Sequence, residues 1–137
     1  MLAVLAGCSQ AINGNSNLAG TDGDQNGVRD DVDSYIRSEF VARPQRNAAE
    51  QYGRALQKVV MMSTADEAES LMIEVSSSMA CIYSVFEGGD RAFHPAAVSQ
   101  KLEDETFDTN ARKKANDRFG QALDGLSWGL SEGETCE

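Results

Sequence analysis

Oxygen-bearing side chains are concentrated in one short segment near the start of the chain, from Asp22 to Asp33. Within these 12 residues, aspartate or asparagine occupies positions 1, 3, 5, 9 and 12, and Gly27 occupies position 6. This spacing suits a calcium loop, because Ca²⁺ takes about six to eight oxygen ligands and a glycine at position 6 allows the chain to wrap one ion. The expected ligands are Asp22, Asp24, Asn26, the backbone carbonyl of Val28, Asp30 and Asp33.

The same segment resembles the aspartate-rich loops of thrombospondin type 3 repeats and the loop-then-helix half of EF-hands in exported bacterial proteins and dockerins. It departs from a sensor EF-hand at Asn26, at Arg29 and at Asp33, which replaces the closing glutamate. No helix is expected before the loop, and no second loop is present to pair with it. The resemblance therefore implies a weak structural Ca²⁺ site, with Mg²⁺ disfavoured because it resists dehydration. The alternative is an acidic turn at a helix N-terminus, where negative charge is favoured without an ion.

The first residues carry a second motif, Leu5-Ala6-Gly7-Cys8. It resembles the lipobox of bacterial lipoproteins, which implies that Cys8 is lipidated and becomes the first mature residue. Only seven uncharged residues precede Cys8, fewer than a signal peptide needs, so we expect a longer start upstream or a clipped terminus. A chance cysteine in a short apolar segment is the alternative. The resemblance implies a lipid-anchored protein of the bacterial cell envelope, on the periplasmic face of the outer membrane or at the cell surface. Since no apolar run approaches ~20 residues, the lipid would be its only membrane contact.

Two further cysteines, Cys81 and Cys136, remain if Cys8 is lipidated. An exported protein matures in an oxidising compartment, where two leftover thiols most simply pair with each other. In the chain-entropy model, a crosslink closing a loop of this length contributes about 4 kcal/mol of stability. The alternative is one buried free thiol and one thiol in a frayed tail.

Catalytic residues are not indicated by any pattern in the sequence. His94 is the sole histidine and lies beside Pro95, which is typical of a loop residue. No serine lies in a Gly-x-Ser-x-Gly frame. The basic cluster Arg112-Lys113-Lys114 is expected to be solvated or to touch a partner. We therefore expect a protein that is not an enzyme.

Apolar residues at three-to-four spacing predict the helices that position these residues. We expect four main helices, over 30–41, 45–62, 64–86 and 106–126, and one short helix over 95–103. Thr64 and Glu67 have the spacing of a capping box, and Gly88-Gly89 ends the third helix. The fold class is all-α, a helical bundle without strands.

The domain organisation follows from these elements. Residues 1–7 are read as a residual signal peptide, 8–21 as a flexible tether, 22–130 as the helical domain with its calcium loop at 22–33, and 131–137 as a C-terminal tail. A chain of 137 residues with 41% apolar content is enough for one domain.

The formal net charge of −10 excludes nucleic acid and anionic lipid headgroups as partners and favours cations or a basic protein. The expected function is that of a non-catalytic, exported calcium-binding lipoprotein that interacts with an unknown envelope protein and is stabilised by one structural Ca²⁺. The alternative is a periplasmic inhibitor or immunity protein that binds a basic toxin or hydrolase.

Overall fold

A computed structural model describes residues 18–137 of the chain. The expected signal-peptide remnant, the lipidation site Cys8 and most of the expected tether lie outside the described residues. Five α-helices follow one another in the described part, and no strand occurs there. The helices are α2 (Asp30–Glu39), α3 (Arg43–Val60), α4 (Ala68–Val85), α5 (Pro95–Thr106) and α6 (Asn110–Ala122), with short 3₁₀ turns η2 (Ala65–Glu67) and η3 (Arg91–Phe93). The all-α prediction is confirmed.

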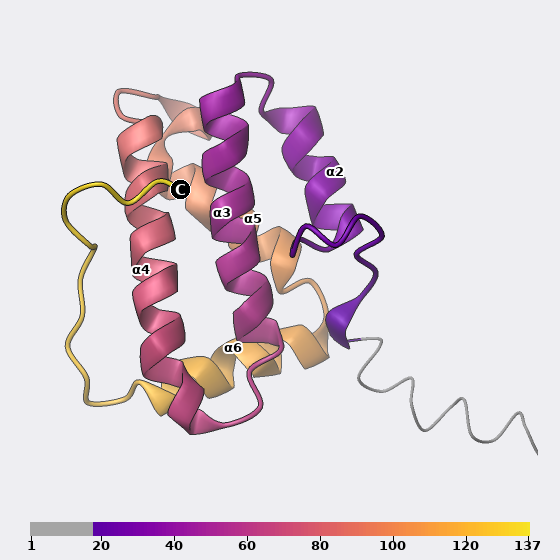
Figure 1. Ribbon diagram of the computed structural model, residues 1–137, viewed down its shortest axis with the longest axis vertical. Helices are drawn as coiled ribbons and strands as arrows, with labels where there is room; N and C mark the ends of the chain where they lie inside the picture. Colours follow the sequence, from indigo (N-terminus) through magenta and orange to yellow (C-terminus); the bar gives the residue numbers. More distant parts are fainter. Residues whose placement is uncertain (1–17) are drawn as a thin grey trace, which may run out of the picture.

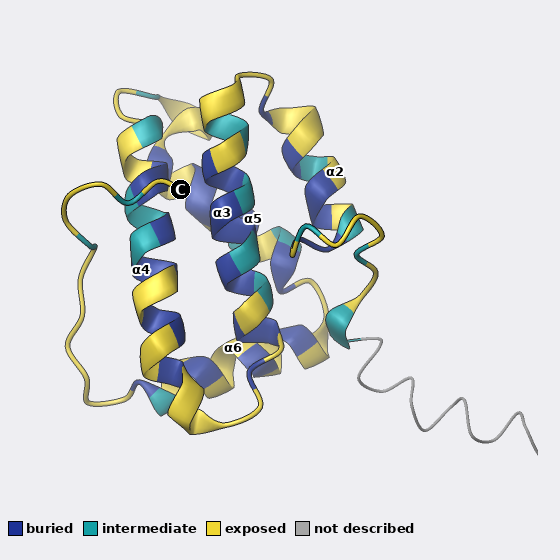
Figure 2. Ribbon diagram, in the orientation of Figure 1, coloured by how far each residue is buried: buried dark blue, intermediate teal, exposed yellow. Residues whose placement is uncertain are grey.

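The long helices α3 and α4 lie side by side and form the most extensive helix pair of the bundle (Figure 1). Helix α2 flanks α3, and α5 lies behind α3 in the view of Figure 1. Helix α6 crosses the ends of α3 and α4. Figure 2 shows that the buried residues lie on the faces that the helices turn toward one another. Because each helix carries apolar residues at three-to-four spacing, one core receives side chains from all five. Among residues 18–137, no helix is both long enough and apolar enough to cross a bilayer.

The starts of α3 and α4 follow their local sequence. Pro44 lies in the first turn of α3, where a missing N–H costs nothing, so it is suited to the start of this helix. Thr64 and Glu67 form the predicted capping box, which opens a single 3₁₀ turn that leads into α4. Inside α4, Ser78 Oγ donates to the carbonyls of Glu74 and Val75, which satisfies a polar group within a continuous helix.

The predicted boundaries of α2, α5 and α6 are wrong. Helix α2 ends at Glu39 instead of residue 41, and Val41 is 81% exposed. The helix expected over 95–103 extends to Thr106, and the one expected over 106–126 spans only Asn110–Ala122. Thr109 decides this division, because its side chain accepts a hydrogen bond from Arg112 N and caps a new helix.

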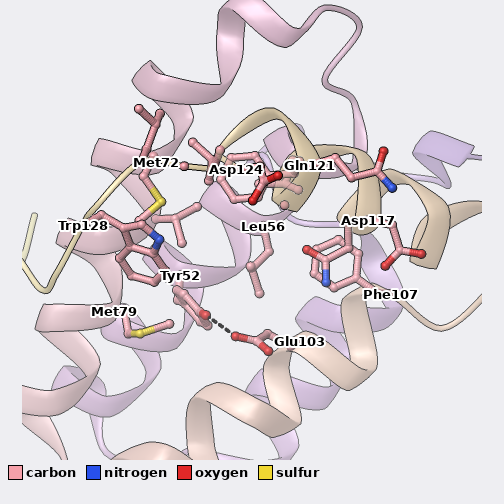
Figure 3. Close-up of a pocket in the computed structure, with 18 residues that line it drawn as sticks. Tyr52, Leu56, Met72, Met79, Glu103, Phe107, Asp117, Gln121, Asp124 and Trp128 are labelled. Carbon is pink, nitrogen blue, oxygen red and sulfur yellow. Dashed lines mark hydrogen bonds between the residues drawn. The ribbon is translucent and has the colours of Figure 1, made fainter.

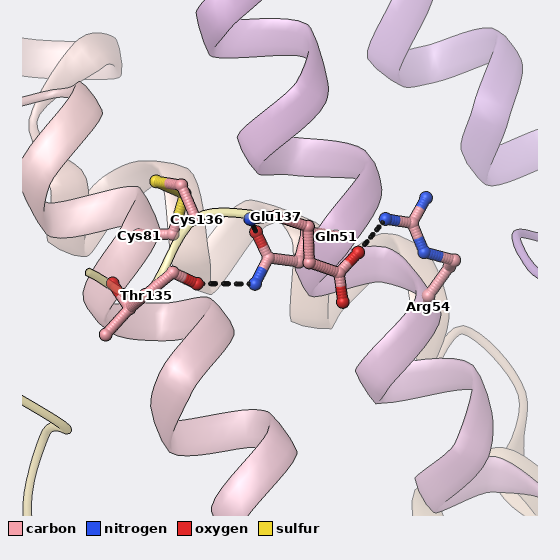
Figure 4. Close-up of a disulfide and its surroundings, with 6 residues drawn as sticks. All are labelled: Gln51, Arg54, Cys81, Thr135, Cys136 and Glu137. Carbon is pink, nitrogen blue, oxygen red and sulfur yellow. Dashed lines mark hydrogen bonds and ion pairs between the residues drawn. A yellow bond between two sulfur atoms is a disulfide. The ribbon is translucent and has the colours of Figure 1, made fainter.

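The predicted disulfide between Cys81 and Cys136 is present, with a Cα–Cα distance of 4.9 Å. It attaches the end of the chain to α4, and α3 holds the same segment by polar contacts (Figure 4). Gln51 donates to Thr135 O at 2.8 Å and accepts from Glu137 N at 3.1 Å, while Arg54 pairs with Glu137 at 2.7 Å. Residues 135–137 are therefore fixed on the bundle.

Candidate metal centre

The carboxylates of Asp22, Asp24 and Asp30 converge in the loop that precedes α2. One carboxylate oxygen from each lies within 4.8 Å of the others. Two oxygens that bind one Ca²⁺ at about 2.4 Å cannot be more than about 4.8 Å apart, so this separation is compatible with a shared ion. This acidic group could hold a metal ion.

The backbone of the loop turns sharply around Asp22. Its two carboxylate oxygens accept hydrogen bonds from Asn26 N at 3.2 Å and Gly27 N at 2.9 Å. The turn requires positive φ at Gln25 (55°) and Gly27 (85°). A Cβ at residue 27 would also lie 3.1 Å from side-chain carbons of Arg54, so both backbone conformation and space favour the glycine predicted at position 6.

Asp30 joins the two ends of the loop to the start of α2. Its backbone N donates to Thr21 O at 2.7 Å, and its side chain accepts from Gly23 N at 3.0 Å. Asp30, Asp31 and Asp33 all lie in the first turn of α2, where the helix dipole favours negative charge. The feature named as the alternative to a metal site, an acidic helix N-terminus, is thus present in the same residues.

Asp33 is not a member of the three-carboxylate group. Its Oδ2 accepts from Asn26 Nδ2 at 3.2 Å and from Arg37 at 2.8 Å, and its side chain is 6% exposed. Its Oδ1 is buried without a hydrogen-bond partner among the described residues. Asn26 Oδ1 accepts from Val28 N, and the Val28 side chain is buried in the core. The structure therefore brings Asp22, Asp24 and Asp30 together and leaves Asp33 and Asn26 bonded to each other beside them.

Arg37 is a residue at this site that the sequence analysis missed. It pairs with Asp33 and approaches Asp24 at 3.4 Å. The signal was available, because Asp33 and Arg37 have the i,i+4 spacing of a helical ion pair. Its side chain is 57% exposed, so these ion pairs add little stability, and another cation can take the place of Arg37.

Arg29 fixes the loop to the bundle. Its buried guanidinium donates to the carbonyls of Glu105 and Thr106 at the end of α5, at 2.9 and 3.0 Å. A cation there satisfies carbonyls without an intrahelical partner and interacts favourably with the helix dipole. Asp31 also pairs with Arg29, and this hydrogen bond lowers the pKa of the Asp31 carboxyl below its usual range.

Arg112 fixes the residues that enter the loop. It is 7% exposed, its Nε donates to Leu18 O at 3.0 Å, and its guanidinium pairs with Asp108 at 2.8 Å. The expectation of a solvated basic cluster is thus wrong for Arg112, although Lys113 and Lys114 are exposed. An arginine on the inner side of an amphipathic helix can extend its charged end to a carbonyl of another segment.

His94 has a structural role in the fold. Its Nδ1 accepts a hydrogen bond from Ala96 N at 3.2 Å, which caps the start of α5 beside Pro95. This agrees with the interpretation of His94 as a loop residue.

Comparison with known proteins adds no relative. The chain matches no protein-family model, no curated protein and no solved structure at a significant level.

Proposed function

We propose that the protein is a non-catalytic, exported calcium-binding lipoprotein of the bacterial cell envelope, which presents its helical domain to another envelope protein. The observation that carries the proposal is the convergence of Asp22, Asp24 and Asp30 within 4.8 Å. Charged carboxylates at this separation repel one another, and a divalent cation between them removes that repulsion. The ion would stabilise the loop in the conformation that Arg29 attaches to α5.

Asp33 supports Ca²⁺ as a second, separate observation. A buried oxygen without a partner carries a desolvation cost of about 1–3 kcal/mol, and such atoms are rare in folded proteins. The unpartnered Oδ1 belongs to the residue at loop position 12, which closes the coordination shell in calcium loops. Asp33 lies outside the group that meets the 4.8 Å limit, so its side chain would have to shift toward the ion to become a ligand. Such a shift would satisfy this oxygen, and the exposed Arg37 would be displaced from Asp24 at small cost.

Calorimetric titration of the purified protein with Ca²⁺ tests the site. We expect one site with a dissociation constant on the order of 10⁻⁴–10⁻³ M, and a weaker response to Mg²⁺. Asp24→Asn should weaken Ca²⁺ binding at least about tenfold, because it removes one carboxylate from the group. Asp66→Asn is the matched control, since Asp66 is exposed and lies far along the chain in η2.

Two results would contradict the metal proposal. One is the absence of any heat above dilution for the unsubstituted protein. The other is equal Ca²⁺ affinity in the Asp24→Asn and Asp66→Asn variants, which would mean that the ion binds elsewhere on an acidic surface. Circular dichroism of each variant separates loss of a ligand from loss of the fold.

The lipid anchor is proposed on the sequence motif ending at Cys8. The proposal is compatible with the described residues, because the first of them, Leu18, is held on α6 by Arg112. An anchor on Cys8 would thus be joined to the domain directly before the proposed ion.

A further inference from the structure

A cavity of about 810 Å³ lies between α3, α4, α5 and α6 and is covered in part by the segment that follows α6. Its size is within the range of small-molecule sites, about 300–1,000 Å³. The cavity is separate from the metal centre, since no residue of the loop at 22–33 lines it. Figure 3 shows its walls, with side chains of α3 and α4 on one side and those of α6 on the other.

One wall of the cavity is apolar and polarisable. The indole of Trp128 lies near the thioethers of Met72 and Met79 in Figure 3, and Leu56 continues this surface. Met72 and Leu56 are buried, whereas Trp128 is 56% exposed, so one part of its ring remains available to a ligand. Methionine side chains adapt to ligands of irregular shape, and indole faces attract organic cations.

Every charged side chain that lines the cavity is acidic. Glu103, Asp117 and Asp124 contribute carboxylates, and no lysine, arginine or histidine is among the lining residues. Within residues 18–137, none of these three carboxylates forms an ion pair. The cavity therefore presents negative charge that the protein itself does not neutralise.

Glu103 is held in place by the core. Tyr52 is fully buried, and its hydroxyl donates to Glu103 Oε1 at 2.6 Å (Figure 3). Burial, together with the nearby Glu103 charge, raises the pKa of Tyr52, so the phenol stays a donor. The half-buried Glu103 carboxylate is thus oriented at the cavity by one oxygen, and its second oxygen has no hydrogen-bond partner among residues 18–137.

We propose that this cavity binds a small organic cation with an apolar body, such as a quaternary ammonium compound or a protonated amine. The Met72–Met79–Trp128 wall takes the apolar body, and Glu103 neutralises the charged group. A fatty acid or other organic anion is excluded by the three carboxylates. A bare metal ion fits poorly, because Glu103, Asp117 and Asp124 do not converge on one centre as the loop carboxylates do.

Trp128 is the only tryptophan of the chain, so its fluorescence reports on the cavity directly. The probe is benzyltrimethylammonium, compared with neutral benzyl alcohol and anionic benzoate. We expect a saturable change in Trp128 emission with the cation, at a dissociation constant below about 1 mM, and at least about tenfold weaker binding of the other two probes. Titrations in EDTA and in excess Ca²⁺ should give the same ranking, because the loop does not line the cavity.

Glu103→Gln keeps an acceptor for Tyr52 and removes the charge, so it should weaken the cation about tenfold or more without changing benzyl alcohol binding. Glu87→Gln, an exposed residue after α4, is the matched control and should bind as the unsubstituted protein does. Asp124→Asn provides a second test at an exposed position that does not threaten the fold. It should weaken the cation by about threefold.

Three outcomes would overturn the proposal. The first is no saturable response to benzyltrimethylammonium. The second is equal affinity for the cation and benzyl alcohol, which would indicate only an apolar cavity. The third is a Glu103→Gln variant that folds by circular dichroism and binds the cation as tightly as Glu87→Gln.

Discussion

Tyr52 is a polar side chain in the centre of an apolar core. Its hydroxyl is satisfied by Glu103, which belongs to the neighbouring α5, so the pair joins two helices as well as orienting the cavity carboxylate. Burial raises the pKa of Tyr52 well above its usual range, and it raises the pKa of Tyr35 to about 12. Both shifts make the free energy of unfolding depend on pH in the alkaline range.

The direction of this linkage follows from the two states. A tyrosine ionises near pH 10 in the unfolded chain, while these two resist ionisation in the fold. Their contribution is fully present below pH about 10 and is lost as the pH rises toward the folded pKa, because the unfolded state releases protons first.

Tyr52→Phe tests both roles of this residue. At pH 7 we expect the free energy of unfolding to fall by about 1.5 kcal/mol, the value of a hydrogen bond to a charged acceptor. Between pH 9.5 and 11.5 the variant should lose stability less steeply than the unsubstituted protein, since one buried phenol is gone. Urea unfolding across this range measures both, with Tyr83→Phe at the protein surface as the control. Parallel alkaline slopes for all three proteins would contradict the assignment.

At the level of elements, four contacts hold segments that have little core of their own. Arg29 attaches the acidic loop to the end of α5, and Arg112 attaches the residues before the loop to α6. At the other end of the chain, the disulfide and Gln51 attach residues 135–137 to α4 and α3. Because these segments bury few apolar side chains, their order depends on such specific bonds.

Removal of the disulfide should reveal this dependence. The bond joins residues 55 apart in sequence, and the chain-entropy model assigns a loop of this length about 4 kcal/mol. We expect Cys81→Ser with Cys136→Ser to lower the free energy of unfolding by about this amount and to expose residues 126–137 to proteolysis under native conditions. Gln51→Ala with the disulfide intact is the control for the polar contacts alone. A double variant with unchanged stability and unchanged protection of the tail would show that the crosslink has no structural role.

At the scale of the whole molecule, the proposed ion lies between the proposed anchor and the bundle. The acidic group occupies residues 22–30, directly after the segment that would lead to a lipid on Cys8. A Ca²⁺ at this place would stiffen the point where the chain enters the domain. The cavity opens elsewhere, among α3, α4, α5 and α6, so an organic cation bound there would not disturb the proposed attachment.

The intact mass of the protein extracted from bacterial membranes tests export and anchoring together. We expect a polypeptide that begins at Cys8 and carries acyl chains, together with a loss of two hydrogens that is reversed by reduction of the disulfide. Cys8→Ser should abolish the acylation and release the domain from the membrane fraction, because a lipid would be its attachment. A membrane-extracted species with the mass of the bare polypeptide would contradict the lipoprotein proposal.

Local sequence patterns predicted the helical class, the capping box and the glycine turn of the acidic loop. Each depends on residues within a few positions of one another, where spacing alone defines geometry. The Cys81–Cys136 bond followed from counting thiols. Helix boundaries were harder to predict. The division between α5 and α6 depends on one side chain, Thr109, which caps α6, whereas the apolar spacing continues across this point.

The long-range contacts could not be predicted from local sequence patterns. Arg29 reaches carbonyls 76 and 77 residues away, and Arg112 bonds to Leu18, 94 residues away. The cavity between α3, α4, α5 and α6 likewise has no local signature. Such features exist because separate helices become neighbours when the chain buries its apolar faces in one core, and the partners of a buried charge are set by that packing rather than by the residues adjacent to it in sequence.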